Sequence, residues 1–135
     1  MIISSGGSTE MPYSESYFTQ NDPVKLANTL ASLVKTYNLD GVDIDWEDDW
    51  SNHNPGMTGY GANRVAGSGP AIPWLVTLTK TLRQLLPRSE GYTISHAPQA
   101  PYFALGYGKF HQLAGDCIDF YNIQYYNQGA VSFDL

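Results

Sequence analysis

The stretch from residue 39 to residue 47 constrains the fold of this chain most, because from Val42 onward it alternates strictly between apolar and acidic residues. This alternation has the two-residue period of a β-strand and not the 3.6-residue period of a helix. It therefore predicts a strand with one apolar face and one acidic face. The apolar face is Val42, Ile44 and Trp46, and the acidic face is Asp43, Asp45 and Glu47.

The acidic face places three carboxyl groups in one row. Next-but-one neighbours on a strand are separated by roughly 6.5 Å, so like charges away from bulk water should raise the pKa of at least one of the three. A carboxylic acid that keeps its proton near neutral pH is suited to general acid catalysis. The structural alternative is the solvent face of an antiparallel strand. We favour a functional role, because charge repulsion along one strand face has no evident structural purpose.

The segments before the acidic strand predict a strand and a helix. Residues 1–8 begin apolar and then break into Ser and Gly, which permits a sharp turn or a close approach to a ligand. Asn21 or Asp22 before Pro23 is a helix-start signal, and apolar residues from Val24 to Tyr37 recur at helical spacing. A strand, a helix and a strand in this order form a βαβ unit with parallel strands.

The segments after the acidic strand continue this alternation of strands and helices. A loop over 48–73 contains Trp50, His53 and Tyr60 as candidate ligand contacts, with loop packing as the alternative. The pattern then predicts a helix over 74–86 with Lys80 and Arg83 on its polar side, a strand over 92–97, a short helix over 109–114 and a strand over 117–126. His96 shares a face with Ile94 and is expected to pack against helices.

Composition excludes several classes of partner and site. A net charge of −6 argues against binding to nucleic acid or to an anionic membrane. The single Cys117 cannot form an intramolecular disulfide and is expected to be a buried thiol, while no Cys and His cluster has zinc-ligand spacing. We therefore expect neither a metal nor another cofactor. No apolar run approaches the ~20 residues of a membrane span, and residues 1–3 are too short for a signal peptide.

The acidic residues of the predicted strand carry a resemblance to a known family. Asp40, Asp43, Asp45 and Glu47 reproduce the Asp-x-x-Asp-x-Asp-x-Glu signature of glycoside hydrolase family 18, the chitinases and their relatives. The resemblance implies that this segment is the fourth strand of a (β/α)8 barrel, with the catalytic residue at its carboxyl end.

Three further segments match motifs of the same family in the same order. Ser4 to Gly7 resembles the Ser-x-Gly-Gly motif that ends barrel strand three. Residues 97–102, which include Gln99, resemble the fifth strand and the following turn in the plant and fungal branch. Residues 124–127 match the Gln-x-Tyr-Asn pattern of strand six. The resemblance thus covers strands three to six of the barrel.

The resemblance also implies a role for each matching residue. Glu47 would donate a proton to the leaving oxygen and later activate water, while the substrate's own acetamido group acts as the nucleophile. Asp45 would hold the acetamido N–H and share a proton with Asp43, and Tyr126 would hydrogen-bond the acetamido oxygen. The remaining matches are Gln124, Asn127, Gly6, Gly7 and Gln99 as substrate-binding residues, and Asp40 and Ser4 as structural residues.

The length of the chain bears on what the resemblance can imply. A chain of 135 residues is short for a (β/α)8 barrel, which typically takes about 250. The expected fold is therefore α/β: a partial (β/α)8 TIM barrel of about four parallel strands, with residues 1–135 forming a single partial catalytic domain. A second copy in a dimer, or a separate half-barrel, is expected to cover the exposed sheet edges.

Three functions remain open from the resemblance. The first is chitinase-like hydrolysis of β-1,4-linked N-acetylglucosamine polymers, with retention of anomeric configuration. The second is a lectin-like protein that binds chitin or chito-oligosaccharides, or an inactive truncated chitinase. The third is an endo-β-N-acetylglucosaminidase. Members of the family are often secreted, although the sequence contains no recognisable signal peptide and its compartment is left open.

Overall fold

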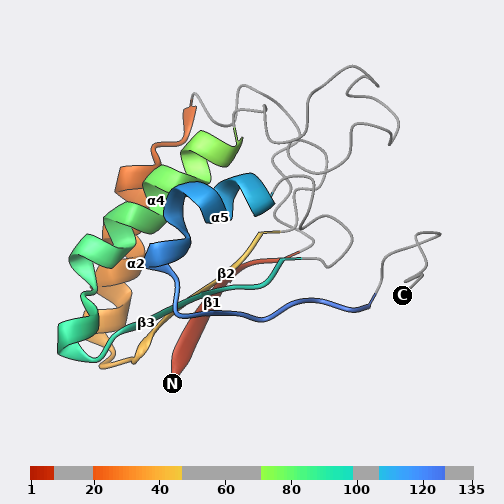
Figure 1. Cartoon of the computed structure of the whole chain (residues 1–135). Coiled ribbons are helices and arrows are strands. Elements are labelled where there is room, and N and C mark those ends of the chain that lie inside the picture. Colours follow the sequence, from red (N-terminus) through yellow and green to blue (C-terminus); the bar gives the residue numbers. More distant parts are fainter. Residues whose placement is uncertain (8–19, 47–70, 99–106, 127–135) are drawn as a thin grey trace, which may run out of the picture.

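The computed structural model describes residues 1–7, 20–46, 71–98 and 107–126, which form strands and helices in alternation (Figure 1). In chain order these elements are β1 (Ile2–Gly6), α2 (Pro23–Thr36), β2 (Gly41–Asp45), α4 (Ala71–Leu85), the 3-10 turn η1 (Arg88–Glu90), β3 (Thr93–His96), α5 (Gly108–Ala114), the 3-10 turn η4 (Gly115–Cys117) and β4 (Phe120–Tyr121).

The four strands in the described part of the chain form one parallel sheet in the order β1-β2-β3-β4. One row of the sheet pairs Ser4 with Asp43 and Asp43 with Ser95, so these three side chains share a face. The neighbouring row pairs Ile3 with Val42 and Val42 with Ile94, and faces the other way. Parallel strands separated by helices confirm the predicted α/β class.

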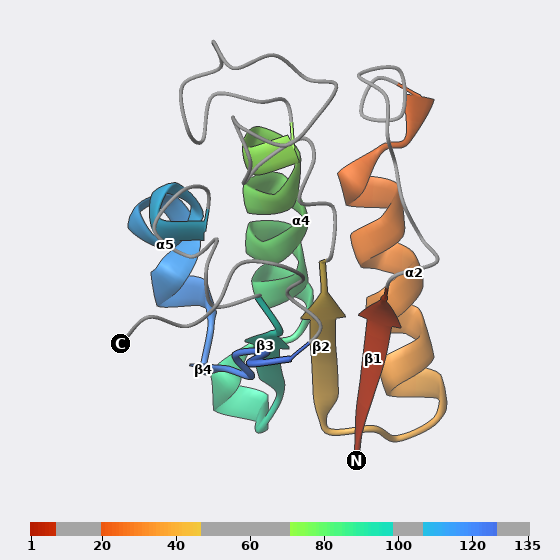
Figure 2. The same ribbon diagram turned by 90° about the vertical axis from the view of Figure 1, so that its right-hand side faces the viewer.

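The α-helices of the described ranges, α2, α4 and α5, lie against the same face of the sheet (Figure 2). Helix α4 lies between α2 and α5 and packs against both. The apolar row of the sheet faces these helices, and Val42 and Ile94 are fully buried there. The polar row, which contains Asp43, is consequently left on the opposite face.

Helix α2 begins where the sequence predicts. The Asp22 carboxylate accepts a hydrogen bond of 2.8 Å from the backbone N–H of Val24, and Pro23 occupies the first turn. The predicted apolar stripe is wrong at its two ends, because Val24 and Tyr37 are exposed and the helix ends at Thr36. Between these ends the stripe is correct. Its buried residues are Ala27, Leu30, Ala31 and Val34.

Helix α4 begins three residues before the predicted start at Trp74. Pro73, which the sequence analysis assigned to the preceding loop, lies in the first turn, where a missing N–H breaks no intrahelical hydrogen bond. Leu75, Leu78 and Leu82 form the buried side of this helix. No helix in the described ranges is long and apolar enough to cross a bilayer.

The predicted strand over 117–126 is wrong in its extent. Cys117 belongs to η4, and β4 comprises Phe120 and Tyr121 alone. Pro98 has no N–H to donate, so a regular ladder cannot continue beyond β3. Cys117 is also only partly buried, because it lies at the end of a surface turn. Burial nevertheless raises the pKa of the Cys117 thiol, and the charge and hydrogen bonding of Asp116 raise it further.

Candidate active site

Strand β2 presents two carboxylates on the sheet face opposite the helices. Asp43 and Asp45 line a depression of about 370 Å³ together with Ala97, Gln124 and Tyr126. Val42 and Ile44 point the other way and are 0% and 3% exposed. The period-two alternation therefore places both acids on one face, as the sequence predicts. Asn122 and Ile123 complete the described wall of the depression.

Three neutral side chains surround the carboxylate of Asp43. The Ser95 hydroxyl donates to Oδ1 at 2.5 Å, and the Asn122 amide nitrogen donates to the same oxygen at 3.0 Å. The Ser4 hydroxyl donates to Oδ2 at 3.3 Å. Both oxygens of Asp43 are therefore held by donors from β1, β3 and the segment after β4.

The carboxylate of Asp45 is held by the amide of Gln124. Gln124 Nε2 donates to Asp45 Oδ1 at 2.7 Å and to the carbonyl oxygen of Ala97 at 2.9 Å. Gln124 is only 4% exposed, so this orientation is fixed by burial as well as by hydrogen bonding. The two N–H groups of the amide nitrogen thus both have protein acceptors.

The inward side chains of β3 are small, which explains how these amides reach β2. Ser95 on β3 and Ala97 directly after it lie between the acids of β2 and the amides that follow β4. A larger side chain at either position would separate Asn122 from Asp43 or Gln124 from Asp45. The site therefore depends on three neighbouring segments of the sheet edge.

The glycines that follow Ser4 approach β2 directly. The N–H of Gly7 donates to the carbonyl oxygen of Asp45 at 2.9 Å. Gly6 has φ +122°, and a Cβ atom built on it would lie 2.0 Å from the same carbonyl oxygen. The sequence indicated a sharp turn or a close approach to a ligand, whereas the close approach in the structure is to the backbone of β2.

Replacing Gly6 by alanine should therefore destabilise the protein by about 3 kcal/mol, since it adds a steric clash to a conformation that L-residues rarely adopt. Gly91→Ala is the matched control. Gly91 also has a positive φ of +87°, but no atom lies within 4 Å of its added Cβ, so about 1 kcal/mol is expected. Urea denaturation measures both values. Equal losses in the two variants would show that the contact with Asp45 contributes nothing.

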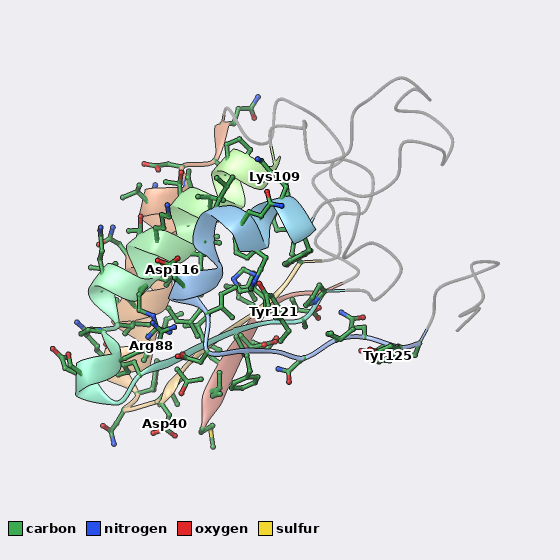
Figure 3. All side chains as sticks on the ribbon, in the orientation of Figure 1. Asp40, Arg88, Lys109, Asp116, Tyr121 and Tyr125 are labelled. Carbon is green, nitrogen blue, oxygen red and sulfur yellow. The ribbon has the colours of Figure 1, made fainter. Side chains whose placement is uncertain are left out.

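Of the other predicted site residues, one lines the depression, one lies far from it, and the rest fall outside the described part of the chain. Tyr126 lines the depression and is 61% exposed, whereas Asp40 lies at the opposite, amino-terminal end of β2, beside the amino group of Met1 (Figure 3). Asp40 is therefore separated from the two acids in the depression. The predicted residues outside the described part of the chain are Glu47, Gln99, Asn127, Trp50, His53 and Tyr60.

His96 packs against the helices, as predicted. It is fully buried, with Nε2 3.1 Å from the Thr79 hydroxyl and Nδ1 3.2 Å from the Tyr107 hydroxyl. The Phe110 ring stacks on it with the centroids 4.8 Å apart. Desolvation by burial lowers the pKa of His96 to about 3, so the ring is neutral at ordinary pH.

Ser95 and Asn122 are the site residues that sequence reasoning missed. Each stands two residues before a position that lines the depression, Ala97 and Gln124 respectively, and therefore shares its face. This spacing was the available signal. Within the described ranges, no group of three or more His, Cys, Asp or Glu side chains is arranged to hold a metal ion.

Comparison with known proteins identifies relatives of this arrangement. The family model of the glycosyl hydrolases family 18 matches residues 1–132. The chain is 39% identical to a GH18 chitinase from Pseudoalteromonas aurantia, with a TM-score of 0.73, covering 96% of this chain and 44% of that one. No curated protein matches the chain.

A second solved structure shares the fold at lower identity. The catalytic domain of a family GH18 chitinase from the fern Peteris ryukyuensis is 22% identical, with a TM-score of 0.57 over 96% of this chain and 42% of that one. The chain thus spans less than half the length of either solved chitinase. Its four parallel strands with intervening helices correspond to part of the TIM barrel of these proteins, which confirms the predicted partial barrel. The chain belongs to the glycosyl hydrolases family 18.

Proposed function

We propose that residues 1–135 are a partial catalytic domain that contributes to chitinase-like hydrolysis of β-1,4-linked N-acetylglucosamine polymers. The observation that carries this proposal is the pair of carboxylates, Asp43 and Asp45, held side by side on one wall of a depression in a family 18 chain. The 39% identity to a chitinase over nearly the whole chain supports the substrate class.

The proposed reaction proceeds in two steps with retention of configuration. The acetamido carbonyl oxygen of the substrate attacks the anomeric carbon, the glycosidic C–O bond breaks, and Glu47 gives its proton to the leaving oxygen. Glu47 then removes a proton from water, which attacks the same carbon and reopens the oxazolinium ring. Asp45 holds the acetamido N–H and balances the positive charge of the intermediate.

The geometry supports a distinct role for each residue around Asp45. The amide nitrogen of Gln124 already donates to Asp45 and Ala97, so we assign to Gln124 the role of orienting Asp45. A sugar hydroxyl that contacts Gln124 would therefore donate to the side-chain carbonyl oxygen of Gln124. Tyr126 lines the depression and is 61% exposed, which supports our proposal that its hydroxyl donates to the acetamido oxygen. Asp43 is proposed to share a proton with Asp45.

Turnover of a fluorogenic chitotrioside by the 135-residue chain tests this proposal. Release of the fluorophore, with retention seen by NMR of the first-formed anomer, supports hydrolysis by the proposed mechanism. Binding of chito-oligosaccharide without turnover would overturn it in favour of a lectin-like protein. Cleavage of N-glycans without cleavage of chito-oligosaccharide would point to an endo-β-N-acetylglucosaminidase instead.

We also propose that a second copy of the chain, or a separate half-barrel, covers the sheet face that carries the acids. Ile2 and Phe120 are on this face and are 38% and 44% exposed, on the two outermost strands of the described sheet. Unpaired strand edges and exposed apolar side chains favour association, and two-fold pairs are the commonest assemblies.

Light scattering after size exclusion should give twice the mass of one chain at micromolar concentration. Phe120→Ser should shift the equilibrium toward monomer, since it removes apolar contact area from the proposed interface. Leu113→Ser is the control, because Leu113 is 43% exposed but lies on α5, on the helical side of the sheet. A wild-type chain that stays monomeric, or equal effects of the two substitutions, would contradict self-association.

A further inference from the structure

Two arginine side chains converge on Asp119 at the amino-terminal end of the sheet, away from the depression. Arg83 Nη2 lies 2.5 Å from Oδ2 of Asp119, and Arg88 Nε lies 2.6 Å from Oδ1. Figure 3 places Arg88 at this end and Tyr125 at the other. The Arg83 side chain is only 11% exposed and that of Asp119 23%, so the pair is largely shielded from solvent.

The same guanidinium groups also hold the backbone before β4. Arg83 Nε donates to the carbonyl oxygen of Cys117 at 3.0 Å, and Arg88 Nη2 donates to that of Ile118 at 2.9 Å. Arg83 Nη1 donates to the carbonyl oxygens of Leu86 and Tyr92, both at 3.1 Å. Residues 117–119 are therefore tied to the end of α4 and to the start of β3.

Asp119 itself contacts one residue of β3 through both its backbone and its side chain. Its N–H donates to the carbonyl oxygen of Ile94 at 2.8 Å, and its Oδ2 accepts from the N–H of Ile94 at 2.7 Å. Burial alone would raise the pKa of Asp119, but the hydrogen bonds from Ile94, Arg88 and Arg83 outweigh it and lower that pKa. The carboxylate is thus ionised when it makes these contacts.

Strand β4 pairs with β3 at two positions only, and it is one of the two edge strands of the described sheet. The backbone hydrogen bonds on either side of it and the Tyr121 hydroxyl, 2.9 Å from Nδ1 of His111, are further restraints on it. The side chains of Phe120 and Ile123 are 44% and 38% exposed, so their packing restrains this segment only weakly. Ile118, which is buried, and Tyr121, which is half-buried, do pack against the core.

The register of β4 decides where the two site amides lie. Asn122 and Gln124 follow β4 directly, and their backbone N–H groups donate to the carbonyl oxygens of His96 and Pro98 at 2.8 and 2.9 Å. A slip of one residue would turn both side chains to the opposite face, and a slip of two would displace each by about 6.6 Å along the strand. Either slip would remove the donors from Asp43 and Asp45.

We propose that Asp119, clamped by Arg83 and Arg88, is a positioning residue that sets the register of β4 and thereby aims Asn122 and Gln124 at the two carboxylates. The clamp lies at the end of the sheet opposite the depression, and its hydrogen bonds and ion pairs go to none of the described residues that line the depression. Its relevance to catalysis rests on the proposed function, but its structural effect can be measured without turnover.

Asp119→Asn tests the clamp, because it removes the charge while keeping the size of the side chain. NMR of the full chain, well below its melting temperature, should show backbone amide exchange at Asn122 and Gln124 at least 10-fold faster than in wild type. Exchange at Val42 and Ile44 on β2 should stay within 2-fold. Glu90→Gln is the matched control, since it removes an exposed carboxylate from η1, two residues after Arg88, and should change neither pair.

Two results would overturn the proposal. Uniform acceleration across β2 and the segment after β4 would mean that the clamp only stabilises the fold, and unchanged exchange at Asn122 and Gln124 would mean that it does not set their position. If Asp119→Asn does not fold, Arg88→Gln gives the same comparison at smaller amplitude, because Arg83 still pairs with Asp119. If the wild-type chain is active, Asp119→Asn should lower kcat about 10-fold and leave KM within 2-fold of the wild-type value. An inactive wild type would refute the proposed function but not the positioning role of Asp119, which amide exchange tests separately.

Discussion

Replacing Glu47 by glutamine should lower turnover of a fluorogenic chitotrioside about a thousandfold, while binding of the same oligosaccharide stays nearly unchanged. Glutamine has the size of glutamate and keeps an acceptor oxygen, but it cannot give a proton to the leaving group. General acid catalysis typically accounts for factors of about 10² to 10⁴. Initial rates over a range of substrate concentrations separate the loss of kcat from any change in KM.

Asp40→Asn is the matched control for this substitution. Asp40 belongs to the same acidic signature and undergoes the same change from carboxylate to amide, but its side chain is 69% exposed at the far end of β2. Turnover should therefore remain close to the wild-type value. Equal residual activity in wild type and Glu47→Gln would remove Glu47 from the mechanism, and a loss as large in Asp40→Asn would show that the assay reports folding.

The sequence predicted the faces of β2 correctly because the backbone itself imposes the two-residue period. Val42 and Ile44 are buried against the helices, and Asp43 and Asp45 line the depression. No tertiary information is needed for that assignment, since successive side chains of any strand point to opposite faces. The roles of Glu47, Gln99 and Asn127 remain predictions from the family resemblance.

The partners of Asp43 could not be predicted in the same way. Ser95 and Asn122 are visibly polar, but the register between separate parallel strands brings them to Asp43. That register depends on helix packing and on contacts such as the Asp119 clamp, which a local pattern does not encode. Arg83 illustrates the same limit: its helical position indicated a solvent-facing charge, yet its side chain is 11% exposed.

The predicted strand over 117–126 failed for a related reason. An apolar residue in a short segment does not show how deeply its side chain is buried or whether its backbone pairs with a neighbouring strand. Ile123 and Tyr125, for example, are 38% and 64% exposed. The neighbouring strand decides how far pairing extends, and Pro98 limits it here. Gln124 and Tyr126, two residues apart, nevertheless share the side of the acids, because both line the depression.

Acidification from pH 7 to pH 5 should destabilise the folded chain by about 2 kcal/mol through His96 alone. Desolvation lowers the pKa of His96 to about 3 in the folded state, whereas an unfolded histidine titrates near 6.5. Between these values only the unfolded chain binds the proton. The contribution of His96 is therefore fully present above pH 6.5 and is lost progressively as the pH falls toward 3.

The hydrogen bonds of His96 explain why the neutral ring is required. The single hydroxyl proton of Thr79 is donated to the carbonyl oxygen of Leu75 at 2.8 Å, so Thr79 accepts from Nε2. Nδ1 is then the unprotonated nitrogen and accepts from the Tyr107 hydroxyl. Protonating Nδ1 would place a charge in a fully buried site and replace this acceptor with a second donor.

Urea denaturation of wild type, His96→Gln and His111→Gln at pH 5, 6 and 7 measures this contribution. His96→Gln should be less stable at pH 7 by about 2 kcal/mol, since it disturbs the contacts with Thr79, Tyr107 and Phe110. Between pH 7 and pH 5, the free energy of unfolding of His96→Gln should fall by about 2 kcal/mol less than that of wild type. His111→Gln leaves His96 in place and should retain the wild-type pH dependence. Parallel pH profiles for wild type and His96→Gln would mean that the burial of His96 contributes nothing to the loss of stability on acidification.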